Sequence, residues 1–369
     1  MSIEDREPAG AFATDAERLL ADCAGAADDA RARLVAATAE LFVPPEYRLS
    51  DMRRAAMRGL AQRMTGTIED LLRRHLATAF AANARLAAEL AGDGPPLAFS
   101  ALESGGVLRD PEFVAILLRR AEGQALAARR GSRPDDQPPL IDTLRDSEPA
   151  IAQAALAYAI AEIRRVDRFD DPLLARTDLP AELHHRLAWW VAAALRRHLV
   201  AQRGVPADAA DQAVMAAAYA TLSGYDESTT LEARAAALAW ALHGGGRLDD
   251  ALLAAATEQG HAPLAVAGFA VRAGIDPAAA WDMATDPAGS RLAVLLRATE
   301  VARAEAARIL LAFAADAAHL PDMLAGYEAL APDRARAVVR RWRLDAGYRR
   351  ALDELGMGGG ANGPPGMAP

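Results

Sequence analysis

The sequence predicts an all-α protein built from stacked helical hairpins in an α-solenoid-like arrangement, preceded by an N-terminal helical domain. Helical patterns of about 10 to 24 residues recur from end to end and are joined by short loops. No stretch shows the alternating β-branched pattern that is typical of a strand. About a quarter of the 369 residues are alanine, and alanine at helix contacts lets helix axes approach closely.

Capping residues mark the predicted helix starts. Thr14-Asp15-Ala16-Glu17 has the spacing of a capping box, in which the threonine and glutamate side chains satisfy free backbone N–H groups. Asp110-Pro111, Asp276-Pro277 and Asp286-Pro287 each place an acid at the N-cap and proline at the first helical position. The predicted helix ends are glycines suited to a left-handed conformation, namely Gly204, Gly224, Gly244, Gly245, Gly246, Gly260 and Gly274.

Composition along the chain predicts the domain organisation. Residues 131–139 are polar and rich in proline, so we expect a linker there. It separates an N-terminal helical domain at 1–130 from a helical repeat domain at 140–355. Residues 356–369 are glycine, proline and small side chains, and we expect a disordered tail.

One segment has the pattern of a repeat unit. Residues 140–156 contain a leucine-rich helix, the turn Asp146-Ser147-Glu148-Pro149 and an alanine-rich second helix. This unit resembles a HEAT repeat, although Ala152 stands where many such repeats carry arginine. Because one such hairpin cannot bury its apolar face alone, we expect it to stack on neighbouring hairpins.

Most of the chain resembles the bacterial family known as domain of unknown function 2336. The resemblance runs through 34–76, 107–130 and 146–163, and it is most specific at 178–196, which reads DLPAELHHRLAWWVAAALR. The resemblance implies a HEAT-like helical fold. It implies no particular activity, because none is established for the family.

Residue usage excludes several classes of function. All 41 basic residues are arginine, so a phosphate-binding loop with its lysine, a kinase lysine and a Schiff-base lysine are all absent. The single Cys23 cannot form an internal disulfide, which fits a reducing compartment. We expect no secretory signal, because acids occur early, and no membrane span, because every uncharged run is shorter than about 20 residues. These features predict a cytoplasmic protein.

The most distinctive chemistry lies in the block at 182–190. On a helix, Glu182, His185 and Trp189 share a face while His184 points about 100° away. Glu-x-x-His is a step used by di-iron bundles, and Glu258 with His261 forms a second copy across a glycine. The alternatives are rings packed between repeats and a partner-binding pocket, since the adjacent Trp189 and Trp190 cannot both face one core.

The second block is basic. Residues 332–355 hold 7 arginines against 4 acids, a net charge of +3, whereas 138–331 hold 16 arginines against 25 acids, a net charge of −9. Arg340, Arg341, Trp342 and Arg343 suit an acidic protein surface or nucleic acid. The overall net charge of −9 disfavours nucleic acid, which is bound through many phosphate contacts.

Together these features predict a non-catalytic interaction protein with a protein partner, a scaffold or regulator, and no cofactor. Two alternatives stay open. One is an enzyme that holds a metal or small ligand at Glu182 and His185. The other is a helical-repeat protein that binds nucleic acid through its C-terminal arginines.

Overall fold

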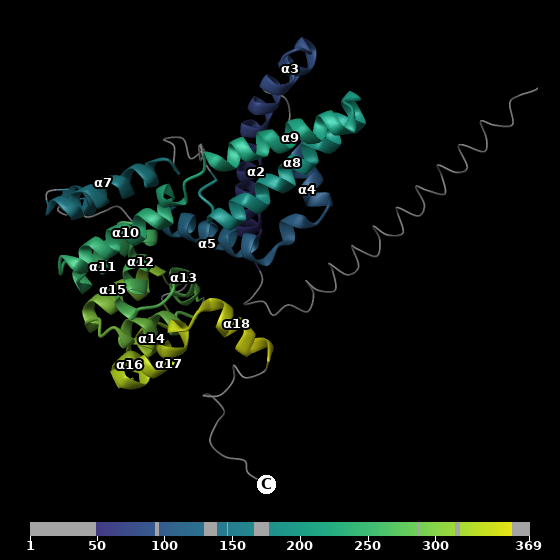
Figure 1. Ribbon diagram of the computed structural model, residues 1–369. Coiled ribbons are helices and arrows are strands. Elements are labelled where there is room, and N and C mark those ends of the chain that lie inside the picture. Colours follow the sequence, from purple (N-terminus) through teal and green to yellow (C-terminus); the bar gives the residue numbers. More distant parts are fainter. Residues whose placement is uncertain are drawn as a thin grey trace, which may run out of the picture. The chain divides into compact units, whose positions relative to one another are not determined.

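The computed structural model describes residues 49–92, 96–128, 139–145, 147–165, 177–286, 288–313 and 318–355. Every regular element in these ranges is a helix (Figure 1), which confirms the all-α prediction. None of the described helices is long and apolar enough to cross a membrane. The capping box at 14–17, Cys23, residues 131–138 of the linker and the tail at 356–369 lie outside the described residues.

The first part contains α2 (Asp51–Ala79), α3 (Ala84–Ala91), α4 (Ala98–Ser104), the short 3-10 helix η2 (Val107–Arg109) and α5 (Pro111–Ala128). A buried stripe of apolar residues runs along α2 and includes Leu60, Met64 and Ile68. The buried Glu69 on the same face accepts hydrogen bonds from the backbone N–H groups of Leu97 and Ala98, at 2.9 Å each. A side chain of α2 therefore caps the start of α4.

Two hairpins follow. The first is α6 (Leu140–Arg145) with α7 (Pro149–Ile163), which pack on each other. The second is α8 (Ala181–Arg203) with α9 (Ala207–Ser223), and α8 also packs on α4. The 3-10 helix η3 (Glu227–Thr229) then leads into α10 (Leu231–Gly244), which packs on α7.

The remaining helices are α11 (Asp250–Glu258), α12 (Ala262–Ala273), α13 (Pro277–Ala284), α14 (Ser290–Ala298), α15 (Arg303–Phe313), α16 (Leu320–Ala329), α17 (Pro332–Val339), η4 (Arg340–Arg343) and α18 (Ala346–Glu354). Contacts continue from α10 to α12, from α12 to α13 and α14, from α11 to α15, and from α14 to α17. One hydrophobic cluster connects α10 to α17 with α6 and α7. This order of packing is compatible with stacked hairpins, and the solenoid remains a prediction.

The helix starts agree with the sequence at two of three Asp-Pro sites. The carboxylate of Asp110 accepts the Phe113 N–H at 2.9 Å, and that of Asp276 accepts the Ala278 N–H at 2.7 Å. The prediction for Asp286 is wrong, because α14 begins at Ser290. Asp286 instead accepts the Ser290 hydroxyl from outside the helix. The turn between Asp286 and Ser290 contains Gly289, which has φ of +68°, a conformation that glycine adopts without steric cost.

The helix ends agree in part. Gly204 and Gly274 adopt φ of +65° directly after α8 and α12, so both end their helices as predicted. Gly224 has φ of −87°. The prediction of a left-handed residue is wrong here, because the backbone of Gly224 continues in the right-handed region at the end of α9.

Candidate functional site

The sequence block at 182–190 is divided between two faces of α8. Glu182 and His185 are exposed, and both tryptophans are half-buried. His184 points inward and is 3% exposed. The block therefore contributes to two separate environments.

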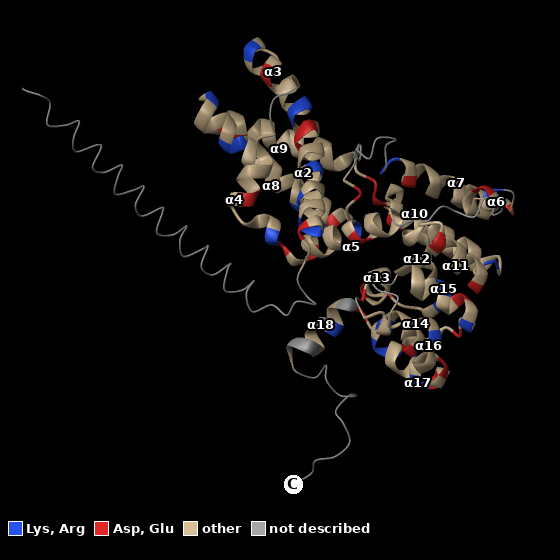
Figure 2. Ribbon diagram, turned by 180° about the vertical axis from the view of Figure 1, so that it is seen from behind, with Lys and Arg blue, Asp and Glu red and all other residues tan. Residues whose placement is uncertain are grey.

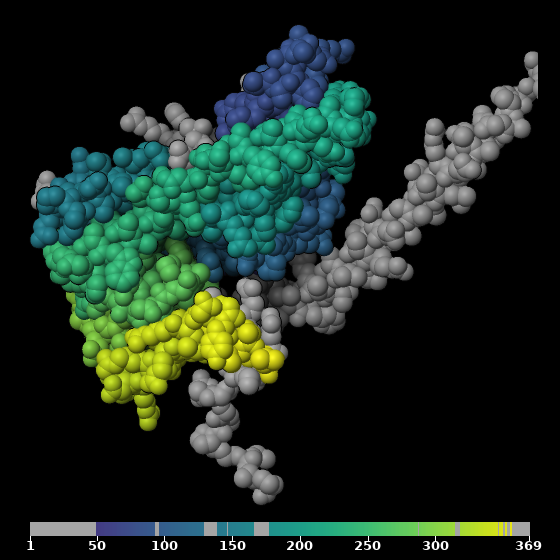
Figure 3. Space-filling view, viewed as in Figure 1, coloured from purple at the N-terminus to yellow at the C-terminus, as the bar shows by residue number. Residues whose placement is uncertain are grey.

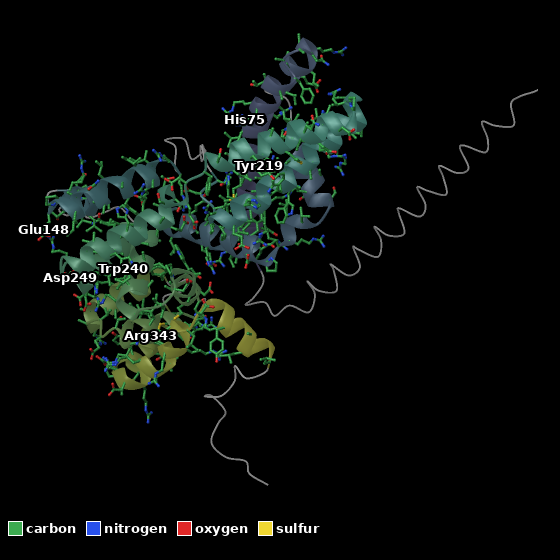
Figure 4. All side chains as sticks on the ribbon, viewed as in Figure 1. His75, Glu148, Tyr219, Trp240, Asp249 and Arg343 are labelled. Carbon is green, nitrogen blue, oxygen red and sulfur yellow. The ribbon has the colours of Figure 1, made fainter. Side chains whose placement is uncertain are left out.

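On the outer face, Trp189 joins α8 to α9. Its indole N–H donates to His185 Nε2 at 3.1 Å, and its ring meets Tyr219 edge-to-face with centroids 5.4 Å apart. Tyr219 is 61% exposed and is labelled on α9 in Figure 4. We call His185, Trp189 and Tyr219 the aromatic patch. Figure 3 shows α9, in teal, on the surface of the molecule.

On the inner face, His184 stacks on Tyr225 with ring centroids 3.7 Å apart. Its Nδ1 lies 2.8 Å from the hydroxyl of Thr177. Burial, reinforced by the neighbouring His185, lowers the pKa of His184 to about 4, so the ring is neutral at physiological pH. The Tyr225 hydroxyl donates to the carbonyl of Leu179. These rings therefore hold the loop that precedes α8.

The same loop is held from the other side by Arg120 of α5. Its Nη1 donates to the carbonyl of Thr177 at 2.8 Å, and its Nη2 donates to the carbonyl of Asp178. Asp178 has φ of +55°, a conformation that costs energy for a residue with a side chain. Because Arg120 is only 7% exposed, these carbonyls replace the water that its guanidinium would otherwise bind.

Four charged side chains meet beside this loop, and we call them the ion network. Arg165 pairs with Asp178 through a contact of 2.5 Å and also pairs with Glu232. Arg120 Nε lies 3.8 Å from Glu232 Oε1. Two arginines thus face two carboxylates.

Arg120 and Glu232 of the ion network stay charged at neutral pH. Burial lowers the pKa of Arg120 to about 10. Burial opposes ionisation of Glu232, but Arg165 and Arg120 outweigh it and lower the pKa of this carboxyl to about 2. The two positive and two negative charges therefore balance.

The ion network lines a cavity of about 450 Å³ between α5, α10, α12 and α13. Most of the other lining is apolar and includes Leu60, Ile116, Ala236, Pro263, Ala267 and Trp281. Glu162 lies at its border, where its carboxylate accepts the Tyr158 hydroxyl at 3.0 Å and lies 2.9 Å from His261 Nδ1.

The histidines and acids of the proposed metal alternative lie in different settings. Glu258 pairs with Arg308, whereas His261 contacts Glu162. Within the described ranges, no three His, Cys, Asp or Glu side chains come together as a metal site.

Residues 340–343 of the basic block form η4, and some of their side chains contact the rest of the fold. Trp342 is half-buried against the hydrophobic cluster, and the Arg349 guanidinium lies 5.3 Å above its ring. Arg343, labelled in Figure 4, donates from Nε to the carbonyl of Ala273 at 2.9 Å. Arg340 is exposed and Arg341 is half-buried. Figure 2 shows acidic and basic residues interspersed over the helices of this region.

The ion network was missed by sequence reasoning. Its members lie on α5, at the end of α7, before α8 and on α10, so no local motif joins them. One signal was present. Arg120 falls in helical phase with the buried Phe113 and Leu117, and a charge on an apolar face indicates a buried partner.

A family model described as an uncharacterised protein conserved in bacteria (DUF2336) matches residues 97–340, more than half of the sequence. The chain belongs to this family. The DUF2336 match includes the aromatic patch, the ion network and Arg340, and it begins after the stretch at 34–76. No curated protein matches the chain. No solved structure matches it either.

Proposed function

We propose that the protein acts by binding rather than catalysis, and that it recruits a protein partner through the aromatic patch. The observation that carries this proposal is the arrangement of Trp189. Its ring is fixed by the hydrogen bond to His185 and by the edge-to-face contact with Tyr219, yet it stays half-exposed. Tryptophan and tyrosine are enriched among the residues that dominate protein interfaces.

Rigidity of the patch supports this role. A partner that docks on side chains already held in place avoids about 0.5–1.5 kcal/mol of ordering cost for each side chain. The Arg196 guanidinium also pairs with Asp211 across the hairpin, with Nη2 and Oδ2 3.0 Å apart. This pair adds a polar contact between α8 and α9. Met215 lies one turn before Tyr219 on α9 and is 49% exposed, which extends the patch with an adaptable apolar side chain.

Contacts of the basic block favour this proposal over nucleic-acid binding. Arg343 and Arg349 both donate to backbone carbonyls, so these two guanidinium groups serve the fold. The net charge of −9 opposes approach to a polyanion.

Site-specific photo-cross-linking in the native bacterial host tests the proposal. p-Benzoylphenylalanine replaces Tyr219 in the full-length chain, and the matched control carries it in place of Trp240, which is 60% exposed on α10. We expect a defined protein adduct from position 219 and none from position 240. Trp189→Ala should abolish that adduct while circular dichroism and the melting temperature show a folded chain. Equal adducts from both positions, or an adduct that survives Trp189→Ala, would contradict the proposal.

A further inference from the structure

We infer that the cavity beside Arg120 binds a small neutral molecule that has an apolar body and a terminal hydroxyl or amide group. This site is independent of the aromatic patch. Its size is the first support. A volume of about 450 Å³ lies within the range of about 300–1,000 Å³ that is typical of small-molecule pockets.

The composition of the cavity walls indicates that the body of the ligand is apolar. Side chains from α2, α5, α12 and α13 line the cavity with apolar surface, including Leu60, Ile116, Pro263 and Trp281. Charged groups gather where Arg120, Arg165, Asp178 and Glu232 meet. An apolar body with one polar end matches this distribution.

Arg120 identifies the polar end. Its Nε is buried and has no hydrogen-bond partner, while its two Nη atoms are used by the loop at 177–178. Glu232 Oε1 lies 3.8 Å away from this Nε, which is too far for a direct hydrogen bond. A buried donor without a partner costs about 1–3 kcal/mol. The wall of the cavity thus contains a donor without a hydrogen-bond partner and a carboxylate oxygen 3.8 Å from it, a separation that one ligand group can bridge.

A hydroxyl or amide satisfies both atoms. Its oxygen accepts the N–H of Arg120, and its own hydrogen is donated to Glu232. A ligand carboxylate would be attracted by Arg120 but repelled by the carboxylates of Glu232 and Asp178. A ligand ammonium group would be attracted by Glu232 but repelled by Arg120 and Arg165. Because the ion network is balanced, a charged ligand would not recover its cost of desolvation.

Other charged groups on the cavity wall already have partners. Arg119 donates to Asp282, and Glu162 accepts from Tyr158. Asp276 and Glu227 accept backbone N–H groups at the starts of α13 and α8, where the helix dipole favours negative charge. The ion network is therefore the part of the wall that selects the ligand group.

Three probes of matched size test the inference on the full-length protein. They are 2-naphthalenemethanol, 2-naphthoate and 2-naphthylmethylammonium, which differ chiefly in the charge of the terminal group. Isothermal titration calorimetry at neutral pH measures their Kd values. We expect the alcohol to bind at least tenfold more tightly than either ion. Absence of alcohol binding at millimolar concentration, or an ion that binds as tightly as the alcohol, overturns the inference.

Two neighbouring variants on α10 locate the binding. Ala236 lines the cavity, whereas Ala237 is exposed and does not. Ala236→Leu places three more carbon atoms in the cavity and should weaken the alcohol at least tenfold, while Ala237→Leu should leave its Kd unchanged. Equal effects of the two variants overturn the assignment.

A third variant tests the role of the ion network. Glu232→Gln removes one negative charge beside Arg120, so the network becomes positive. We expect the ratio of naphthoate to alcohol affinity to rise at least tenfold, while the melting curve reports that the variant is folded. An unchanged ratio in the folded variant contradicts the assignment of Glu232, and a variant that unfolds is replaced by Asp178→Asn with the same expectation.

Discussion

Thr177 Oγ1 lies 2.8 Å from Nδ1 of His184, and this contact connects α8 to the loop that holds the ion network. The same threonine gives its carbonyl to Arg120. His184 therefore couples the inner face of α8 to the cavity. The aromatic patch lies on another face of the same helix, so α8 carries the patch on one face and contacts the loop beside the cavity with another.

The buried ring of His184 makes stability depend on pH. The unfolded chain binds a proton near pH 6.5, whereas the folded chain binds it only at about pH 4, because burial lowers this pKa. Stability is therefore fully present above the unfolded pKa and falls as the pH drops toward 4. We expect this group to contribute a loss of about 2 kcal/mol between pH 7 and pH 5.

Urea denaturation of wild type and His184→Gln at both pH values measures this loss. The variant should show a smaller drop in the free energy of unfolding, because its amide does not titrate. His185→Gln removes only the smaller of the two causes that lower the pKa of His184 and should keep most of the wild-type dependence. Identical pH dependence in wild type and His184→Gln would exclude the assignment.

Two adjacent arginines on α5 should differ sharply in their effect on stability. Arg120→Met leaves the carbonyls of Thr177 and Asp178 without their buried donor and removes one of the two cations beside Glu232, and we expect a loss of about 3–5 kcal/mol. Arg119→Met removes only a partly exposed pair with Asp282, which is worth about 1 kcal/mol or less. Chemical denaturation compares the two variants. Similar losses would mean that Arg120 is not the buried centre of the network.

Much of the fold could be predicted because its signals are local. The cap at Asp110 and the hairpin at 140–163 depend on residues a few positions apart, so they can be recognised in the sequence. Asp286 shows the limit of this reasoning. Its carboxylate and the following proline suit a helix start, but the chain turns at Gly289 before α14 begins.

The candidate site could be predicted only in part. The contact of His185 with Trp189 follows from helical spacing, and Tyr219 enters only because α9 folds back on α8. The ion network depends on tertiary structure. Arg120 and Glu232 are separated by more than a hundred residues, and the backbone conformation of Asp178 results from the contacts that surround it.

The basic segment should act mainly through the fold. Arg343 donates to the carbonyl of Ala273, the last residue of α12, where a cation is favourable. Arg340 and Arg343 are both exposed, and the carbonyl contact of Arg343 distinguishes them. We expect Arg343→Ala to cost about 1 kcal/mol and Arg340→Ala to stay within about 0.5 kcal/mol. Thermal and urea denaturation give both values. Equal effects would show that the carbonyl contact contributes nothing.

Close packing of α11 on α12 depends on a glycine in the middle of α12. A Cβ at Gly268 would lie 2.4 Å from Leu253 Cδ2 and 3.2 Å from Leu248 Cδ1. Alanine in a helix is normally favourable by about 0.5–1 kcal/mol relative to glycine, but overpacking a core typically costs about 1–3 kcal/mol. We therefore expect Gly268→Ala to destabilise the protein by about 1–2 kcal/mol. Gly66 of α2 is the matched control, because its Cβ would meet nothing within 4 Å. Gly66→Ala should raise the free energy of unfolding, and a rise for Gly268→Ala as well would mean that the two helices have room to separate.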